Sequence, residues 1–181
     1  AIAQMDTNHF FIGTGSGLFR ARIERGKLNI VHDEAVESID TPVHELYYHA
    51  ISKQLFVGNY KEGILIYDMG KTGKIIPCQS LNNVEINRIV TLNAHELLIA
   101  TGGKGVYKLD MNTYISEPYI TADYSSYNGM NGNNINDIYV DEEERIWLAN
   151  YPTGITIRNN RYGSYDLIRH SIGNNLSLVN D

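Results

Sequence analysis

Short apolar runs alternate with polar turns along the whole chain, and no long stretch keeps the 3.6-residue period of an amphipathic helix. Four segments share one pattern: two apolar residues, a glycine or alanine, a polar turn, a second glycine and another apolar run. This pattern predicts two strands joined by a short turn, which is a β-hairpin. The segments begin at Phe11, Phe56, Leu98 and Trp147, and their second glycines are Gly17, Gly63, Gly105 and Gly154.

The similarity extends beyond each hairpin on both sides. Residues 86–101 align with residues 135–150 without a gap, and a looser strand is expected after every hairpin. Each repeat therefore holds four short antiparallel strands in roughly 45 residues, which is typical of a β-propeller blade, although a solenoid or a sandwich is an alternative. The expected outer strands are Lys27 to His32, Lys74 to Gln79, Ser116 to Thr121 and Ser164 to His170.

The repeats predict an all-β chain of about four four-stranded antiparallel blades. The expected blades are residues 1–40, 41–83, 84–132 and 133–173, and residues 174–181 resemble the start of a further blade. Three arrangements are open: a closed four-blade ring, two chains that form an eight-blade ring, or an arc of a larger propeller. The start of a further repeat favours the arc. In an open arc the apolar faces of the end blades form an association surface, for self-association or for neighbouring blades.

Composition narrows the possible partners. The formal net charge is −6, from 15 basic and 21 acidic residues, so the basic stripe of a nucleic-acid-binding protein is missing. No apolar run is long enough for a membrane helix. The single cysteine, Cys78, excludes an intrachain disulfide and a multi-cysteine zinc site. Because Ala1 opens directly into a strand pattern, no signal peptide is expected, and the numbering could start after one or inside a longer protein.

The fourth repeat resembles the two-component regulator propeller repeat. In that repeat an Ile-x-x-Ile-x-x-Asp strand leads into an acidic turn, a Trp-Leu/Ile-Gly/Ala-Thr/Asn strand follows, and a Gly-Leu/Ile pair comes after it. The first three repeats lack the tryptophan and the acidic aspartate, and Phe11, Phe56 and Leu98 stand near the tryptophan position. The matching residues are Ile135, Ile138, Asp141, Trp147, Leu148, Ala149, Asn150, Gly154 and Ile155.

The resemblance implies a signal-transduction role. Such repeats form the periplasmic sensor domain of hybrid two-component systems, chiefly in Bacteroidetes, in front of a small β-sandwich, a membrane helix, a histidine kinase and a DNA-binding output domain. The signals that this family detects are mostly glycan fragments. The catalytic kinase domains are not in this chain, so the resemblance implies a periplasmic carbohydrate-sensing propeller rather than an enzyme.

The residues themselves give little support to catalysis, a metal or a cofactor. The glycine-rich runs at residues 13–17 and 101–105 are hairpin turns, because a strand and not a helix follows each one. The six histidines lack the i, i+4 spacing of a zinc protease, and residues 141–144 read as a solvated turn rather than a calcium loop. A glycoside hydrolase needs two facing carboxylates, and Glu62 and Asp123 are the only ones in the relevant loops.

Tyrosines, asparagines and lysines gather in the loops that build one face of a propeller. Aromatic rings stack on sugars, amides pair with hydroxyls, and an ammonium group attracts the carboxylate of an acidic sugar. The same residue types also suit tight turns, and a protein-interaction scaffold or a propeller enzyme acting on carbohydrate are alternative functions. The candidate ligand-binding residues are Asn59, Tyr60, Lys61, Lys104, Tyr124, Tyr127, Asn150 and Tyr151.

Overall fold

The computed structural model describes residues 1–31, 39, 41–70, 75–76, 81–123, 130, 132–172, 174 and 177–178. These residues form four antiparallel sheets of four strands each, and in each sheet the strands lie side by side in chain order. The four-stranded sheets that the repeat predicts are therefore confirmed. The chain folds as two compact units, residues 1–86 and residues 87–181.

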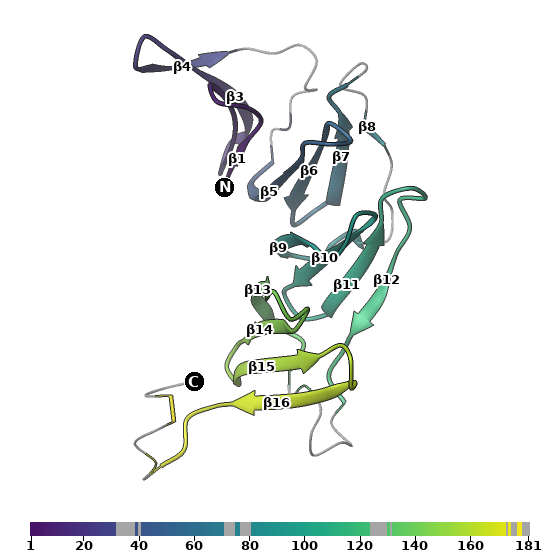
Figure 1. The fold of residues 1–181 in the computed structure, drawn as a ribbon. Coiled ribbons are helices and arrows are strands. Elements are labelled where there is room, and N and C mark those ends of the chain that lie inside the picture. Colours follow the sequence, from purple (N-terminus) through teal and green to yellow (C-terminus); the bar gives the residue numbers. More distant parts are fainter. Residues whose placement is uncertain are drawn as a thin grey trace. The chain divides into compact units, whose positions relative to one another are not determined.

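The first unit contains two of the sheets. In Figure 1 the edge strand β1 lies beside β5, and β2 also contacts β5. Only Ile75 and Ile76 of the expected outer strand Lys74 to Gln79 are described as a strand, and its other residues lie outside the described part. The strands are β1 (Ile2–Gln4), β2 (His9–Thr14), β3 (Gly17–Glu24), β4 (Lys27–Val31), β5 (Val43–His49), β6 (Gln54–Asn59), β7 (Gly63–Asp68) and β8 (Ile75–Ile76).

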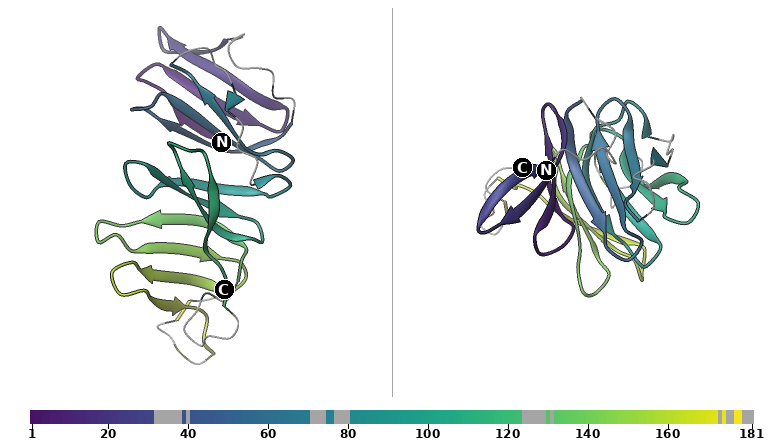
Figure 2. Two further views of the ribbon diagram at one scale, coloured as in Figure 1. Left: turned by 90° about the vertical axis from the view of Figure 1, so that its right-hand side faces the viewer. Right: turned by 90° about the horizontal axis from the view of Figure 1, so that it is seen from above.

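The second unit contains the other two sheets, with β10 in contact with β13. Figure 2 shows the strands of the last sheet, β13 to β16, next to one another as a simple meander. Its order confirms the expected arrangement, in which the strand at Ile135 comes first. The strands are β9 (Ile86–Thr91), β10 (Glu96–Thr101), β11 (Gly105–Asp110), β12 (Ser116–Ile120), β13 (Ile135–Val140), β14 (Ile146–Asn150), β15 (Gly154–Asn159) and β16 (Ser164–Ile168).

Each unit has its own apolar core between its two sheets. In the first unit Ala3 and Phe11 pack with Leu46, Leu55 and Val57. The second unit has a larger cluster, in which one face of the third sheet meets one face of the fourth. A single four-stranded sheet cannot bury both faces alone, so each sheet depends on its neighbour. The buried members of the second cluster are Leu98, Ala100, Val106, Ile120, Met130, Ile135, Ile138, Ile146 and Leu148.

The backbone conformation explains why the second glycine recurs in the repeats. Gly63, Gly105 and Gly154 have positive φ angles of 72°, 78° and 90°, a region that side chains with a Cβ disfavour. A Cβ on Gly105 would also collide with the carbonyl oxygen of Ile120, and one on Gly154 would collide with that of Ile168. Glycine at these positions therefore lets the hairpin turn pass against the end of the outer strand.

Candidate functional site

The candidate residues of the first unit sit in the β6–β7 turn. Asn59 is completely buried, and its Oδ1 accepts a 2.7 Å hydrogen bond from the backbone nitrogen of Glu62. Its Nδ2 donates to Oε2 of Glu62 at 3.2 Å. Both polar ends of the Asn59 amide are thus used to close the turn. Asn59, one of the candidate ligand-binding residues, is the last residue of a buried strand, and its amide caps its own hairpin.

Tyr60 and Lys61 occupy the tip of that turn. The Tyr60 side chain is 61% exposed, and Lys61 is also exposed. The backbone carbonyl of Lys61 accepts a 3.2 Å hydrogen bond from the nitrogen of Asn83, which ties the tip to the chain that leads out of the sheet. The ring and the ammonium group are therefore presented to solvent from an anchored backbone.

In the second unit, two loops are joined by one pair of asparagines. Gly103 and Gly105 of the β10–β11 turn donate backbone hydrogen bonds of 3.1 Å and 2.7 Å to the carbonyl of Asn133. Tyr151 of the β14–β15 turn donates one of 2.9 Å to the carbonyl of Asn134. The Asn133 Oδ1 accepts a further 2.7 Å bond from the nitrogen of Ala122. Asn133 and Asn134 thus hold the hairpin turns of two successive sheets at one edge.

Asn150 carries an unused acceptor at this edge. Its side chain is only 5% exposed, and its Nδ2 donates a 3.1 Å hydrogen bond to the carbonyl of Gly132. Its Oδ1 has no hydrogen-bond partner among the described residues, and neither does the buried Oγ1 of Thr153. Buried polar atoms normally have a partner, so these two covered atoms are exceptions to that rule.

Two other candidates flank this acceptor in the second unit. Tyr151 is 61% exposed, and Lys104 is exposed at the tip of the β10–β11 turn. The nitrogen of Lys104 donates a 3.1 Å hydrogen bond to Oγ1 of Thr101, and that hydroxyl donates a 2.7 Å bond to the carbonyl of Gly105. The backbone of Lys104 is therefore fixed while its ammonium group stays in water. Tyr124 and Tyr127 lie outside the described residues.

In the part of the chain that the structure describes, no group of three or more histidine, cysteine, aspartate or glutamate side chains could hold a metal ion. Glu62 is engaged with Asn59 in the first unit, and Asp123 belongs to the second. Among the described residues there is also no helix long and apolar enough to cross a membrane.

The motif residues Asp141 and Trp147 have a structural function that sequence reasoning did not find. Oδ1 of Asp141 accepts hydrogen bonds from the nitrogens of Glu143 and Arg145, at 3.0 Å and 2.9 Å. Its Oδ2 accepts from Nε of Arg145 at 2.7 Å and from Nε1 of Trp147 at 2.8 Å. The acidic turn is thus closed by one carboxylate. Asp6 and Asn93 close the equivalent turns of the first and third sheets, each from one position further along.

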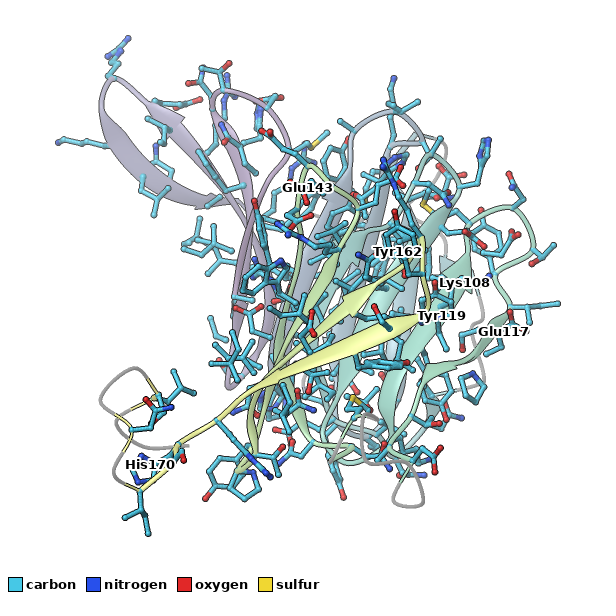
Figure 3. The ribbon with its side chains drawn as sticks, turned by 60° about the horizontal axis from the view of Figure 1, so that its bottom comes forward. Lys108, Glu117, Tyr119, Glu143, Tyr162 and His170 are labelled. Carbon is cyan, nitrogen blue, oxygen red and sulfur yellow. The ribbon has the colours of Figure 1, made fainter. Side chains whose placement is uncertain are left out.

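A second feature that the sequence did not reveal is a cation–aromatic stack in the second unit. The Arg158 guanidinium lies 4.5 Å from the ring centre of Tyr119 and 5.9 Å from that of Tyr165. Lys108 lies 5.5 Å from Tyr119 and pairs with Glu96 at 2.8 Å (Figure 3). Nε and Nη1 of Arg158 are covered and lack a partner among the described residues, so stacking replaces hydrogen bonding there. The sequence did contain one signal for this stack, because Arg158 is a charged residue within the alternating apolar run of β15.

No protein-family model matches the sequence, and the search of curated proteins found no match. Solved structures do match. The extracellular domain of BT4673 from B. thetaiotaomicron, described as a one component system in one structure and as a hybrid two component system in another, matches in both. The first aligns with a TM-score of 0.72 and 18% identity over 99% of this chain and 23% of that one, and the second with 0.67 and 21% over 92% and 24%. The extracellular domain of BT3049, a hybrid two component system from the same organism, gives 0.55 and 18% over 99% and 29%. The RRP9 WD40 repeats give 0.66 and 10% over 92% and 49%.

These likenesses establish the architecture. The chain spans about a quarter of the length of the extracellular domains that it matches. Both the WD40 match and the four meander sheets identify the sheets as propeller blades, so the predicted all-β propeller fold is confirmed. The described chain is a partial β-propeller with the fold of the extracellular domains of B. thetaiotaomicron two-component systems.

Proposed function

We propose that this chain is part of the extracellular, periplasmic ligand-sensing propeller of a two-component signalling protein, and that its ligand is a glycan fragment. The observation that carries the proposal is the structural match over 99% of the chain to the extracellular domain of BT4673. The match concerns the fold, and the role in sensing is carried over from it by inference. In such a role the ligand shifts the population of receptor conformations, and the chain itself needs no catalytic group.

The chemistry of the β14–β15 turn supports a carbohydrate as the ligand. Tyr151 offers an exposed ring, and Lys104 of the neighbouring turn offers an exposed ammonium group. An aromatic face beside hydrogen-bonding groups is the combination that binds the apolar and hydroxyl faces of a sugar ring. Lys104 favours an acidic sugar over a neutral one.

The test is calorimetric titration of the 181-residue chain with a panel of neutral and uronic-acid oligosaccharides. We expect at least one oligosaccharide to release heat and to raise the melting temperature. Binding should weaken in Tyr151→Ala and stay unchanged in Tyr162→Ala, whose ring is 82% exposed in a turn between β15 and β16. A panel in which no sugar binds the folded chain would show that the glycan role is wrong.

A protein-interaction scaffold is the second candidate, and the observation that favours it is the fold that the chain shares with the RRP9 WD40 repeats. The chain lacks the Gly-His and Trp-Asp signatures of WD repeats. A protein that binds in the absence of any sugar, with the Tyr151 turn dispensable, would favour this role over glycan sensing.

A further inference from the structure

The β3–β4 hairpin of the first unit concentrates positive charge in a chain whose formal net charge is −6. Residues 20–27 hold Arg20, Arg22, Arg25 and Lys27 against one carboxylate, Glu24. Arg22 pairs with Glu24 at 2.9 Å. Arg25 and Lys27 are exposed and have no ion pair among the described residues. Two cations at the tip of the hairpin are therefore available to a partner.

The cations line a hollow of about 680 Å³, together with the amide side chain of Asn29. Arg22 is paired with Asn29 on β4 and with His9 on β2, so these three side chains share one face of the sheet. Phe11, two residues beyond His9, lies on that same face and belongs to the core that it forms with the second sheet. The hollow therefore opens on the face that already has a neighbouring sheet, and not on the uncovered face.

β4 is the free edge of the first sheet, because only β3 is paired with it (Figure 1). The turn residues Arg25 and Gly26 have φ angles of 51° and 74°, which is typical of a two-residue hairpin loop. Glu24 and Lys27, on either side of that loop, are consequently the first hydrogen-bonded pair of the hairpin.

The phase of the hairpin shows which backbone groups face outward. The next pair, Ile23 and Leu28, is a non-hydrogen-bonded one. In agreement, the nitrogen of Ile23 donates a 2.8 Å hydrogen bond away from β4, to the carbonyl of Asn8. By the same alternation the N–H and C=O groups of Leu28 and Ile30 point away from β3. None of these groups has a hydrogen-bond partner among the described residues.

The other outer strands are poorer templates for an acidic partner strand. Pro118 removes a donor from β12, Asp166 places a negative charge on β16, and only two residues of β8 are described. A further blade of the same protein would also leave the β4 edge open, since blades pack through their faces, as the third and fourth sheets do.

We infer that β4 binds an extended acidic peptide, which adds a fifth strand to the first sheet. The peptide backbone pairs with the outward N–H and C=O groups of Leu28 and Ile30. Its alternate side chains are carboxylates that lie on the face of the hollow, beside Lys27 and Arg25. The free edge accounts for a peptide backbone and the cations account for the acidic side chains, whereas a sugar uses only the cations. The surface belongs to the first unit and the candidate glycan turn at Tyr151 to the second, so each can fail without the other.

The probe is a fluorescein-labelled heptapeptide in which glutamate alternates with valine, titrated with the 181-residue chain and followed by fluorescence anisotropy. We expect saturable binding that weakens as salt screens the charges. Lys27→Glu should weaken binding at least about 5-fold. Arg161→Glu, at an exposed arginine in the turn between β15 and β16, is the matched control and should bind like the parent.

A second pair of variants separates strand addition from charge attraction. Ile30→Pro removes an outward N–H that makes no bond within the sheet, so it should weaken binding at least about 10-fold. Ile30→Ala keeps that N–H and should bind nearly as well as the parent. Circular dichroism checks that all variants fold. A heptapeptide methylated at every backbone nitrogen needs no variant: it keeps its carboxylates, cannot donate to the edge and should not bind.

Three results would overturn the inference. The first is a folded parent chain that does not bind the alternating peptide, as would happen if the chain's own Asp33, Glu34 and Glu37 neutralised the hairpin. The second is equal binding of the methylated peptide or of Ile30→Pro, which would show charge attraction without strand addition. The third is a sulfated hexasaccharide that binds through Lys27 while the peptide does not, which would assign the hollow to a glycan.

Discussion

The indole Nε1 of Trp147 donates a 2.8 Å hydrogen bond to Oδ2 of Asp141. These are the two residues that set the fourth repeat apart from the other three, and they lie on opposite sides of one turn. Arg145 completes the arrangement, with its Nε on the same carboxylate oxygen at 2.7 Å and its guanidinium 5.8 Å from the Trp147 ring centre. The aspartate and the tryptophan of the repeat motif thus close the turn between the first two strands of the blade, β13 and β14.

This carboxylate should make stability depend on pH. Burial alone raises the pKa of Asp141, but hydrogen bonds from Trp147, Arg145 and Glu143 outweigh it and lower the pKa from 3.8 to about 2. Because the folded-state pKa is depressed, the stabilisation is fully present above pH 3.8 and is lost as the pH falls through about 2. We expect Asp141→Asn to be less stable than the parent above pH 4, with a difference that shrinks toward pH 2.

Urea unfolding at a series of pH values, followed by circular dichroism, measures this difference. Glu142→Gln is the control, since Glu142 is exposed in the same turn and accepts none of the hydrogen bonds that close it. If the difference in unfolding free energy between the parent and Asp141→Asn stayed constant from pH 5 to pH 2, the role given to this carboxylate would be contradicted.

Replacing Gly105 should destabilise the third sheet. Gly105→Ala forces a Cβ into a positive-φ backbone, which costs about 1–3 kcal/mol, and the Cβ also collides with the carbonyl of Ile120. Gly103→Ala has a positive φ of 106° without a neighbour within 4 Å, so it should lose less stability. Gly15→Ala has free space and should be nearly neutral. The melting temperatures of the three variants give their order of stability. Equal decreases in melting temperature would contradict the steric collision at Gly105.

The Arg158–Tyr119 stack should contribute to the contact between the two sheets of the second unit. In a double-mutant cycle with Arg158→Met and Tyr119→Leu, we expect a coupling free energy of about 0.5–2 kcal/mol. The Lys108→Met and Tyr119→Leu cycle is the comparison. Its coupling should be smaller, because the ammonium is 5.5 Å from the ring centre and is held by Glu96. Denaturant unfolding measures both cycles, and no coupling for Arg158 would mean that it only fills space.

The exposed loop tyrosines should affect ligand affinity and leave stability unchanged. Tyr60→Ala and Tyr151→Ala each remove a ring that is 61% exposed, so the unfolding free energy should change by less than about 0.5 kcal/mol. Loss of one stacked ring should weaken binding of an oligosaccharide about 2- to 12-fold. Calorimetric titration of both variants, with Tyr162→Ala beside them, checks this. A sugar that binds all four proteins equally would place its site elsewhere.

The repeat was readable in the sequence because it depends on local rules. Period-two apolar runs fix the strands, and the second glycine marks a turn where only a residue without a Cβ fits, as the φ of 72° to 90° at Gly63, Gly105 and Gly154 shows. Both signals lie within a few residues of one another. The four-strand meander therefore followed from the sequence alone, and the likeness to two-component propellers was visible in the fourth repeat.

The sequence located the candidate site in particular loops, but it did not show which side chains of those loops are exposed. Asn59 and Asn150 are the same residue type at the same repeat position, and the sequence made both candidates for ligand binding. In the structure both are buried, and Asn59 uses both ends of its amide on Glu62, whereas Asn150 keeps a free Oδ1. The difference arises because Asn150 meets the chain at Gly132, which is 18 residues away.

The sequence by itself determined which segments become strands, where they turn and that each sheet needs a neighbour to cover its apolar face. Only the tertiary structure decided which side chains are used in contacts within the protein and which stay exposed. Asp141 is consumed by its turn, Arg158 by Tyr119, and Ala149, Ile155 and Ile168 remain uncovered among the described residues. Backbone propensity acts over a few residues, whereas burial and hydrogen-bond satisfaction depend on segments that are distant in the chain and meet only in the fold.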